Sequence, residues 1–250
     1  MVSKMKLNAM AEFHHGPTTR RDDGALNAAR RRGFLSRLPE SLVDAVVRAA
    51  QRVEYPAGTV GLSHDQVPKA AIVLSGVLRS YIYYPDGTQA TVRYLRPGDM
   101  TGVYAKRLPA MARGVQAVER SELLLVDGER MKELSLADPR FAWALVEELT
   151  TVLNATQRAL YLRAFGTVRQ RVVSAIVDRA TASGALAAGR EVLGTQQDLA
   201  TAVGSVREVV AATLATLKQD GLVDVRRGVV VILDPARLSR DAEAVLTVGS

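Results

Sequence analysis

The sequence predicts an α+β protein in which an antiparallel, jelly-roll-like β-roll comes first, one long helix follows, and a winged helix-turn-helix ends the chain. Three observations predict this order. Short alternating segments separated by turn signals fill residues 59–127. Helical spacing of apolar residues then continues without a break over about 137–165. A short helix, a glycine turn, a second helix and a basic hairpin follow in 194–234.

The composition limits both the partners and the chemistry of the chain. It has 250 residues, 48% of them hydrophobic, a formal net charge of +7 and an isoelectric point of about 9.9. This charge favours an anionic partner such as nucleic acid, a membrane surface or a phosphorylated ligand. The absence of cysteine excludes disulfides, cysteine-held iron–sulfur clusters, thiolate zinc sites and cysteine nucleophiles. No apolar run approaches the ~20 residues that span a bilayer, and the N-terminus lacks a signal-peptide core. We therefore expect a cytoplasmic protein without a membrane partner.

The N-terminal third is predicted to contain an arm and the start of a folded domain. Residues 1–33 are polar and basic, which predicts a flexible arm. A helix is expected between Phe34 and Tyr55, where Pro39 supplies a start signal and apolar residues recur at helical spacing. This helix and the strands after it make up a predicted roll domain over 34–136.

Five segments within the roll domain have the alternation of short strands. They are KAAIVLSG, VLRSYIYYPDG, TQATVRYLRPGD, ARGVQAVERS and ELLLVDG, each bounded by glycine, Pro-Asp-Gly or a polar pair. Pro85-Asp86-Gly87 predicts a hairpin turn, because proline presets φ and glycine accepts a positive φ. Many short strands at regular spacing are typical of an antiparallel roll or sandwich.

Residues 137–166 are predicted to form one helix of roughly 40 Å, with Asp138 as its N-cap and Pro139 in its first position. One apolar stripe consists of Phe141, Leu145, Leu149, Val152, Leu153 and Thr156. Other faces carry Trp143, Leu160, Tyr161 and Leu162. A helix that only covers its own sheet needs a single apolar face. The additional faces therefore favour a seam with a partner helix in a homodimer.

Residues 167–250 are predicted to form the C-terminal domain. Thr195 and the acid three residues later form a capping box at the start of a short helix. Gly204 then stands at a sharp turn, and Ser205 is expected to cap a second helix that ends at Gly221. The segment LVDVRRGVVVIL predicts a hairpin that turns at Arg-Arg-Gly, which is a wing. This order of elements is typical of a winged helix-turn-helix.

A domain of this kind places the N-terminal end of its second helix in the major groove of DNA. Arg207 and Glu208 stand there, and the helix core does not need them. Arginine pairs bidentately with guanine, and glutamate accepts a hydrogen bond from cytosine N4. Further contacts with phosphates or bases are expected from Thr195, Gln196, Gln197, Ser205, Arg226 and Arg227. The sequence thus predicts double-stranded DNA as a partner.

The roll, long helix and winged helix-turn-helix, in this order, resemble the Crp/Fnr family of bacterial transcription regulators over about residues 34–240. The best-matched motif is TQQDLATAVGSVREVV, in which Arg207 and Glu208 match the family's base-reading pair. Val206 replaces the usual phosphate-binding serine, and Ala212 replaces a second arginine. The resemblance implies a homodimer on a palindromic operator, half-sites about one helical turn apart, and RNA polymerase as a further partner.

The resemblance also implies a site for a small anionic effector in the segment GDMTGVYAKRLPAMARG and on the long helix. In the cyclic-AMP-binding members a Gly-Glu pair, an Arg-Ser pair and Thr-Ser on the long helix hold the nucleotide. Gly102, Arg113 and Thr156 match that pattern, whereas Val103, Gly114 and Gln157 depart from it. The phosphate anchor is therefore retained, but the acid that accepts from the ribose hydroxyl is missing. A buried hydroxyl without its acceptor typically costs about 1–3 kcal/mol, so ordinary tight binding of cyclic AMP is not expected.

Three alternatives remain for the effector. In the first, the roll binds a cyclic nucleotide in another pose, or a different phosphorylated ligand such as cyclic di-GMP, and Lys106 and Arg107 supply positive charge for it. In the second, the roll binds an apolar ligand. In the third, it binds no effector. The last case is a constitutive or architectural DNA-binding protein, which is the alternative function. A haem or metal site is not expected, because His64 is the only histidine of the roll domain. No catalytic residues are predicted, since the chain has no nucleophile set, metal cluster or phosphate loop, and we expect no enzyme activity.

Overall fold

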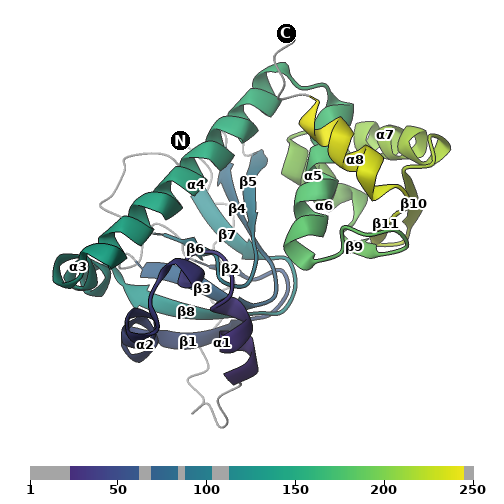
Figure 1. Cartoon of the computed structure of the whole chain (residues 1–250). Helices are drawn as coiled ribbons and strands as arrows, with labels where there is room; N and C mark the ends of the chain where they lie inside the picture. The colour runs from purple at the N-terminus through teal and green to yellow at the C-terminus, as the bar shows by residue number, and fades with distance from the viewer. Residues whose placement is uncertain (1–22, 62–68, 84–87, 103–112, 245–250) are drawn as a thin grey trace, which may run out of the picture.

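A computed structural model describes residues 23–61, 69–83, 88–102 and 113–244, and it confirms the predicted α+β fold (Figure 1). The roll lies at one end and the helix-turn-helix domain at the other, and the long helix α4 runs along the roll toward the second domain. The three parts follow one another in the predicted order.

The chain folds earlier than the predicted arm of residues 1–33 allows. Helix α1 (Asp23–Ala29) lies within that range, and Ala29 is completely buried in the core, which corrects the boundary of the arm. Residues 1–22 lie outside the described part of the chain. The helix expected between Phe34 and Tyr55 is shorter than predicted. It divides into a 3-10 turn η1 (Leu35–Arg37), helix α2 (Glu40–Ala49) and strand β1 (Gln51–Tyr55).

The roll consists of two four-stranded antiparallel sheets. The first has the order β1-β8-β3-β6, with β8 (Ser121–Asp127), β3 (Lys69–Ser75) and β6 (Met100–Thr101). The second has the order β2-β7-β4-β5, with β2 (Val60–Gly61), β7 (Arg113–Ala117), β4 (Leu78–Tyr83) and β5 (Gln89–Leu95). Alternate residues of both sheets fill the core between them, including Val73, Leu78, Leu95, Val115 and Leu123. The predicted hairpin joins β4 to β5 in register Tyr83–Gln89, and its turn lies outside the described residues.

Two helices lead from the roll to the C-terminal domain. Helix α3 (Gly128–Ala137) was not predicted separately from the sequence. Helix α4 (Pro139–Phe165) begins as predicted, with the Asp138 carboxylate accepting from the Arg140 amide and Pro139 in the first turn. Its 27 residues span roughly 40 Å. Gly166 follows its last residue.

The C-terminal domain is a three-stranded sheet covered by four helices. The helices are α5 (Val168–Ser183), α6 (Gln196–Val203), α7 (Arg207–Gln219) and α8 (Pro235–Glu243), and α8 was not predicted. The sheet has the order β10-β11-β9, with β10 (Val223–Arg226), β11 (Val229–Ile232) and β9 (Glu191–Leu193). Strands β10 and β11 form the predicted wing. Helices α5 and α6 also lie against β5 of the roll.

Among the described residues, no single helix is long and apolar enough to cross a membrane. Helices α6 and α7 together would pass as a bent pair by length and composition alone. Their apolar residues, among them Leu199, Val203, Val210, Leu214 and Leu217, pack in the core of the C-terminal domain.

Candidate DNA interface and effector site

The turn between α6 and α7 has the geometry of a helix-turn-helix. The two helices are bent by 107° relative to each other, within the usual range of about 90–120°. Gly204 makes the turn with φ +59, a left-handed conformation that side chains rarely adopt. A Cβ at this position would also overlap the guanidinium of Arg163. The positive φ therefore requires glycine here, and the missing side chain leaves room for the Arg163 guanidinium.

Two arginines outside the motif hold this turn in place. Arg163, near the end of α4, donates from Nη1 to the carbonyl of Gly204 at 2.7 Å. Arg171, in α5, donates from Nη1 to the carbonyl of Val203 at 3.0 Å. The last carbonyls of α6 have no partners within their own helix, so these donors satisfy groups that would otherwise be left open. Neither arginine is indicated by a local pattern in the sequence.

The first turn of α7 presents the predicted base-reading pair to solvent. Arg207 and Glu208 are both exposed, and neither side chain forms a hydrogen bond or ion pair within the described residues. Val206, which stands where the family has a serine, is 58% exposed and is the N-cap of α7. The expected cap at Ser205 is therefore wrong by one residue. The α7 start has no side-chain cap, which leaves its amides available for a phosphate.

The other predicted contacts differ in how available their side chains are. The Thr195 hydroxyl forms the predicted capping box with Asp198, accepting from its amide at 3.1 Å and donating to Oδ2 at 2.9 Å. The Thr195 hydroxyl is therefore already hydrogen-bonded within the first turn of α6. Gln197 is exposed, whereas Gln196 and Ser205 are half-buried.

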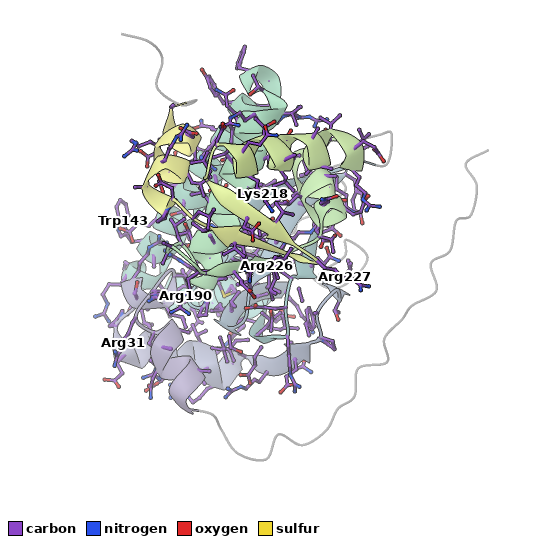
Figure 2. The ribbon with its side chains drawn as sticks, turned by 90° about the vertical axis from the view of Figure 1, so that its right-hand side faces the viewer. Arg31, Trp143, Arg190, Lys218, Arg226 and Arg227 are labelled. Atoms are coloured by element: carbon purple, nitrogen blue, oxygen red, sulfur yellow. The ribbon has the colours of Figure 1, made fainter. Side chains whose placement is uncertain are left out.

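The wing carries the predicted cations at its tip. Arg226 is paired with Glu191 at 3.3 Å and with Asp224 at 3.4 Å. Arg227 is exposed and has no such partner among the described residues. Figure 2 shows both arginines at the wing, on the side of the molecule that faces the viewer. Of the two side chains, that of Arg227 is thus the more available for contact with an anion.

The effector segment is described only at its two ends. Gly102 has φ +82, and a Cβ there would overlap the carbonyl oxygen of Lys69, so this glycine is required by the backbone alone. Arg113 begins β7 opposite Ile82 of β4. Val103, Lys106, Arg107 and His64 lie outside the described residues. The structure thus fixes the backbone positions of the matched glycine and arginine.

Tyr81 occupies the space beside Gly114, where the family pattern has a serine. A Cβ at Gly114 would lie 2.5 Å from both Cζ and Oη of Tyr81. The tyrosine is 1% exposed; its hydroxyl lies 3.2 Å from that of Tyr83, and the Arg79 guanidinium lies 4.5 Å from its ring centre. Burial raises the pKa of Tyr81 above its usual value. The Tyr81 ring therefore occupies the space that a serine side chain at position 114 would need. The sequence pattern does not indicate this role of Tyr81.

Helix α4 has two apolar faces with different surroundings. Phe141 and Leu145 are buried in the roll core, where Phe141 meets Phe34 edge to face at 5.8 Å. Leu149 and Leu153, which the predicted stripe groups with these two residues, are exposed, as are Trp143, Val146, Leu160 and Phe165. Thr156 and Gln157 are exposed as well, and the Thr156 hydroxyl donates to the Val152 carbonyl at 2.8 Å.

A buried ionic cluster fastens α4 to the roll. Glu148 is 1% exposed and accepts from Arg37 at 2.9 Å and from Arg93 of β5 at 2.8 Å. Both carboxylate oxygens thus have a charged donor, which a buried carboxylate requires. Among the described residues, no group of histidines and acids could hold a metal ion.

Comparisons with known proteins agree with this architecture. Residues 52–138 match the family model of the cyclic nucleotide-binding domain, and residues 170–241 match that of the Crp-like helix-turn-helix domain. The chain is 25% identical over 198 residues to the cAMP-activated global transcriptional regulator Vfr of Pseudomonas aeruginosa, covering 76% of this chain and 92% of that one. It is 25% identical over 219 residues to a CRP-like cAMP-activated global transcriptional regulator of Mycobacterium tuberculosis, covering 85% and 97%.

A solved structure shows the same arrangement of elements. A Crp/Fnr-family transcriptional regulator from Thermus thermophilus superposes with a TM-score of 0.62 at 25% identity, covering 77% of this chain and 98% of that one. The two domain matches occur in the order that the structure shows, and the relatives are matched over nearly their full length. The chain belongs to the Crp/Fnr family of DNA-binding transcription regulators.

Proposed function

We propose that this regulator binds a palindromic operator as a homodimer and reads it with the N-terminal end of α7. One observation carries the proposal: Arg207 and Glu208 stand exposed on the first turn of α7 without a partner among the described residues. The arginine donates to O6 and N7 of guanine, and the glutamate accepts from cytosine N4. Gln197 and Arg227 add contacts on either side.

The exposed face of α4 supports the homodimer. Val146, Leu153 and Leu160 recur every seven residues, with Leu149 and Thr156 between them at three-residue spacing. The four leucine and valine side chains are between 47% and 68% exposed. A heptad pattern of this kind is the seam of a two-stranded coiled coil. Thr156, the candidate effector residue of α4, then lies at the dimer axis.

The roll is proposed to bind a small anionic effector, either a cyclic nucleotide or another phosphorylated ligand. The match to the cyclic nucleotide-binding domain and the two cAMP-activated relatives support this class of ligand. Val103 and the Tyr81 ring beside Gly114 argue against the usual pose of cyclic AMP. The protein acts by binding rather than by catalysis, in the cytoplasm, where it meets the chromosome and RNA polymerase.

The DNA-binding proposal is tested by selecting operators from random duplexes and measuring affinity by fluorescence anisotropy. The expected operator is a palindrome bound about 10³-fold or more tightly than bulk DNA. Arg207→Ala should lose about 1–3 kcal/mol and relax specificity at one base pair per half-site. Arg130→Ala, which removes an exposed arginine of α3, should bind like the parent. Equal affinity for random DNA would favour the architectural alternative, and parental binding by Arg207→Ala would refute the placement of α7.

The effector proposal is tested by calorimetry with cyclic AMP, cyclic GMP and cyclic di-GMP on the full chain. Heat of binding with one of them should be lost in Arg113→Ala. If none of the three gives heat, the nucleotide class is discarded, and the DNA-binding result stands independently.

A further inference from the structure

A cavity of about 470 Å³ lies between the roll and the C-terminal domain. On the roll side it is lined by Val77, just before β4, and by Val118 and Glu119 in the turn between β7 and β8. On the other side it is lined by the end of α5 and the chain that leads into β9. Cavities of about 300–1,000 Å³ at domain interfaces are typical sites for small molecules. None of the residues assigned to the effector site lines it.

Arg179 lines this cavity and is the strongest indication of a ligand. Arg179 lies in the second-last turn of α5, and it is 8% exposed. Within the part of the chain that the structure describes, its guanidinium forms no hydrogen bond and no ion pair, and its nearest aromatic contact is the Tyr94 ring at 6.0 Å. A buried cation without an acid is costly, so such a group is usually matched by an anion.

The surroundings of Arg179 leave this cation unneutralised. Asp178, its neighbour in sequence, is already bound to Arg158 at 2.7 Å. Gly194 faces the guanidinium, and a Cβ there would lie 2.5 Å from Nη1. The glycine therefore leaves room for the arginine but supplies no charge. The guanidinium keeps its donors available to the cavity.

Among the described residues, a second arginine and one unpaired acid are the other charged groups that line the cavity and are available to a ligand. Arg190 is exposed, and its side chain has no partner among the described residues, while its carbonyl is fixed by the Ile232 amide at 2.9 Å. In Figure 2 it lies at the edge of the C-terminal domain that faces the roll. Of the two acids in the cavity, Glu191 is paired with Arg226, and Glu119 forms no ion pair in the described structure. The cavity thus offers two cations and one carboxylate acceptor.

We propose that this cavity is a second ligand site, which binds a nucleotide-sized phosphorylated compound through Arg179 and Arg190. Arginine matches phosphate oxygens bidentately, and Glu119 accepts a hydrogen bond from a hydroxyl or amino group of the same ligand. Because the lining comes from both domains, a bound ligand stabilises their present arrangement.

The test is equilibrium calorimetry on the full-length protein with AMP, cyclic AMP and pyrophosphate at up to millimolar concentration. AMP is expected to bind saturably, and Arg190→Ala and Arg179→Met should each weaken it by at least about tenfold, the effect of one lost charge-assisted hydrogen bond. Arg190 is exposed, so its replacement keeps the test valid even if Arg179→Met fails to fold. Arg31→Ala, an exposed arginine of the N-terminal region, is the matched control.

Arg113→Ala distinguishes this cavity from the roll site. It should leave AMP binding unchanged here while it abolishes any effector binding in the roll. The second site is refuted if none of the three probes binds saturably, or if Arg190→Ala binds AMP like the parent.

Discussion

Gly204 connects the turn of the helix-turn-helix to the end of the long helix. Its left-handed φ turns the chain, and the lack of a side chain admits the Arg163 guanidinium to the Gly204 carbonyl. Arg163 stands seven residues after Thr156 on α4, so one side chain links the helix that carries this candidate effector residue to the helix-turn-helix. Changes at the residue scale can therefore affect DNA binding without touching DNA.

Gly204→Ala tests whether this contact matters beyond the backbone conformation. Alanine in a left-handed conformation costs roughly 1 kcal/mol, and displacing Arg163 should raise the loss of stability to about 2–3 kcal/mol. The control is Gly184→Ala, because Gly184 also has a positive φ (+70) at a helix end but nothing within 4 Å of its added Cβ. Urea unfolding measures both variants. Equal losses of stability would show that the Arg163 contact contributes nothing.

Helix α4 packs one face in the core of the roll and leaves a second apolar face exposed. The buried face ends in the Glu148 cluster with Arg37 and Arg93, and the exposed face carries the heptad of leucine and valine side chains. The two faces make separate predictions, because one concerns the fold of a single chain and the other concerns association.

For the buried face, Glu148→Gln should lower the free energy of unfolding by about 3 kcal/mol, since it removes the charge of the one buried carboxylate that the partly buried Arg37 and Arg93 share. Glu147→Gln is the neighbouring control, because that side chain is 45% exposed and forms only a longer ion pair with Arg37, at 3.7 Å. Thermal unfolding of the two variants should separate them by several degrees. Similar midpoints would mean that the cluster is dispensable for stability.

For the exposed face, Leu153→Asp should convert the proposed homodimer to a monomer, because a carboxylate at the proposed seam would be buried without a partner. Leu136→Asp is the control, as Leu136 is 79% exposed on α3 away from the heptad. Sedimentation equilibrium gives the mass of each variant. A monomeric parent would refute the seam, and a dimeric Leu153→Asp would place it on another face.

Local signals in the sequence account for most of the correctly predicted elements. Asp138 and Pro139 start α4, the Thr195–Asp198 capping box starts α6, and Arg-Arg-Gly turns the wing, all of which depend on neighbours within a few residues. Features that join distant parts of the chain were missed. Arg163 and Gly204 are 41 residues apart, and Arg37 and Glu148 are 111 apart, so no local pattern indicates them.

The apolar faces of α4 illustrate the same limit. Periodicity identified many apolar positions but could not say which of them meet the roll, so one predicted stripe mixed Phe141 and Leu145 with Leu149 and Leu153. Serine is a preferred N-cap residue, so the sequence favours Ser205 as the cap of α7. The extended backbone at Val206 instead makes that residue the N-cap. In the effector region, the sequence indicated Gly114 as a departure but could not indicate that Tyr81 fills the space.

At the scale of the whole molecule, the charge of +7 should make DNA binding strongly dependent on salt. Each arginine that neutralises a phosphate contributes about one unit to the slope of log affinity against log salt. Arg227→Ala should reduce that slope by about 1 for each wing that contacts DNA and weaken all sequences alike. Lys132→Ala on α3 should leave the slope unchanged. An unaltered slope for Arg227→Ala would place the wing away from the backbone.

The contact between Tyr81 and Gly114 means that neither residue can change alone. A serine at 114 meets the tyrosine ring, and a smaller residue at 81 leaves an empty space beside the glycine. Among related chains, an aromatic residue at 81 should therefore accompany glycine at 114, and serine at 114 should accompany a smaller neighbour. The evolutionary route between this pocket and that of a cyclic-AMP-binding regulator passes through a coupled pair of substitutions.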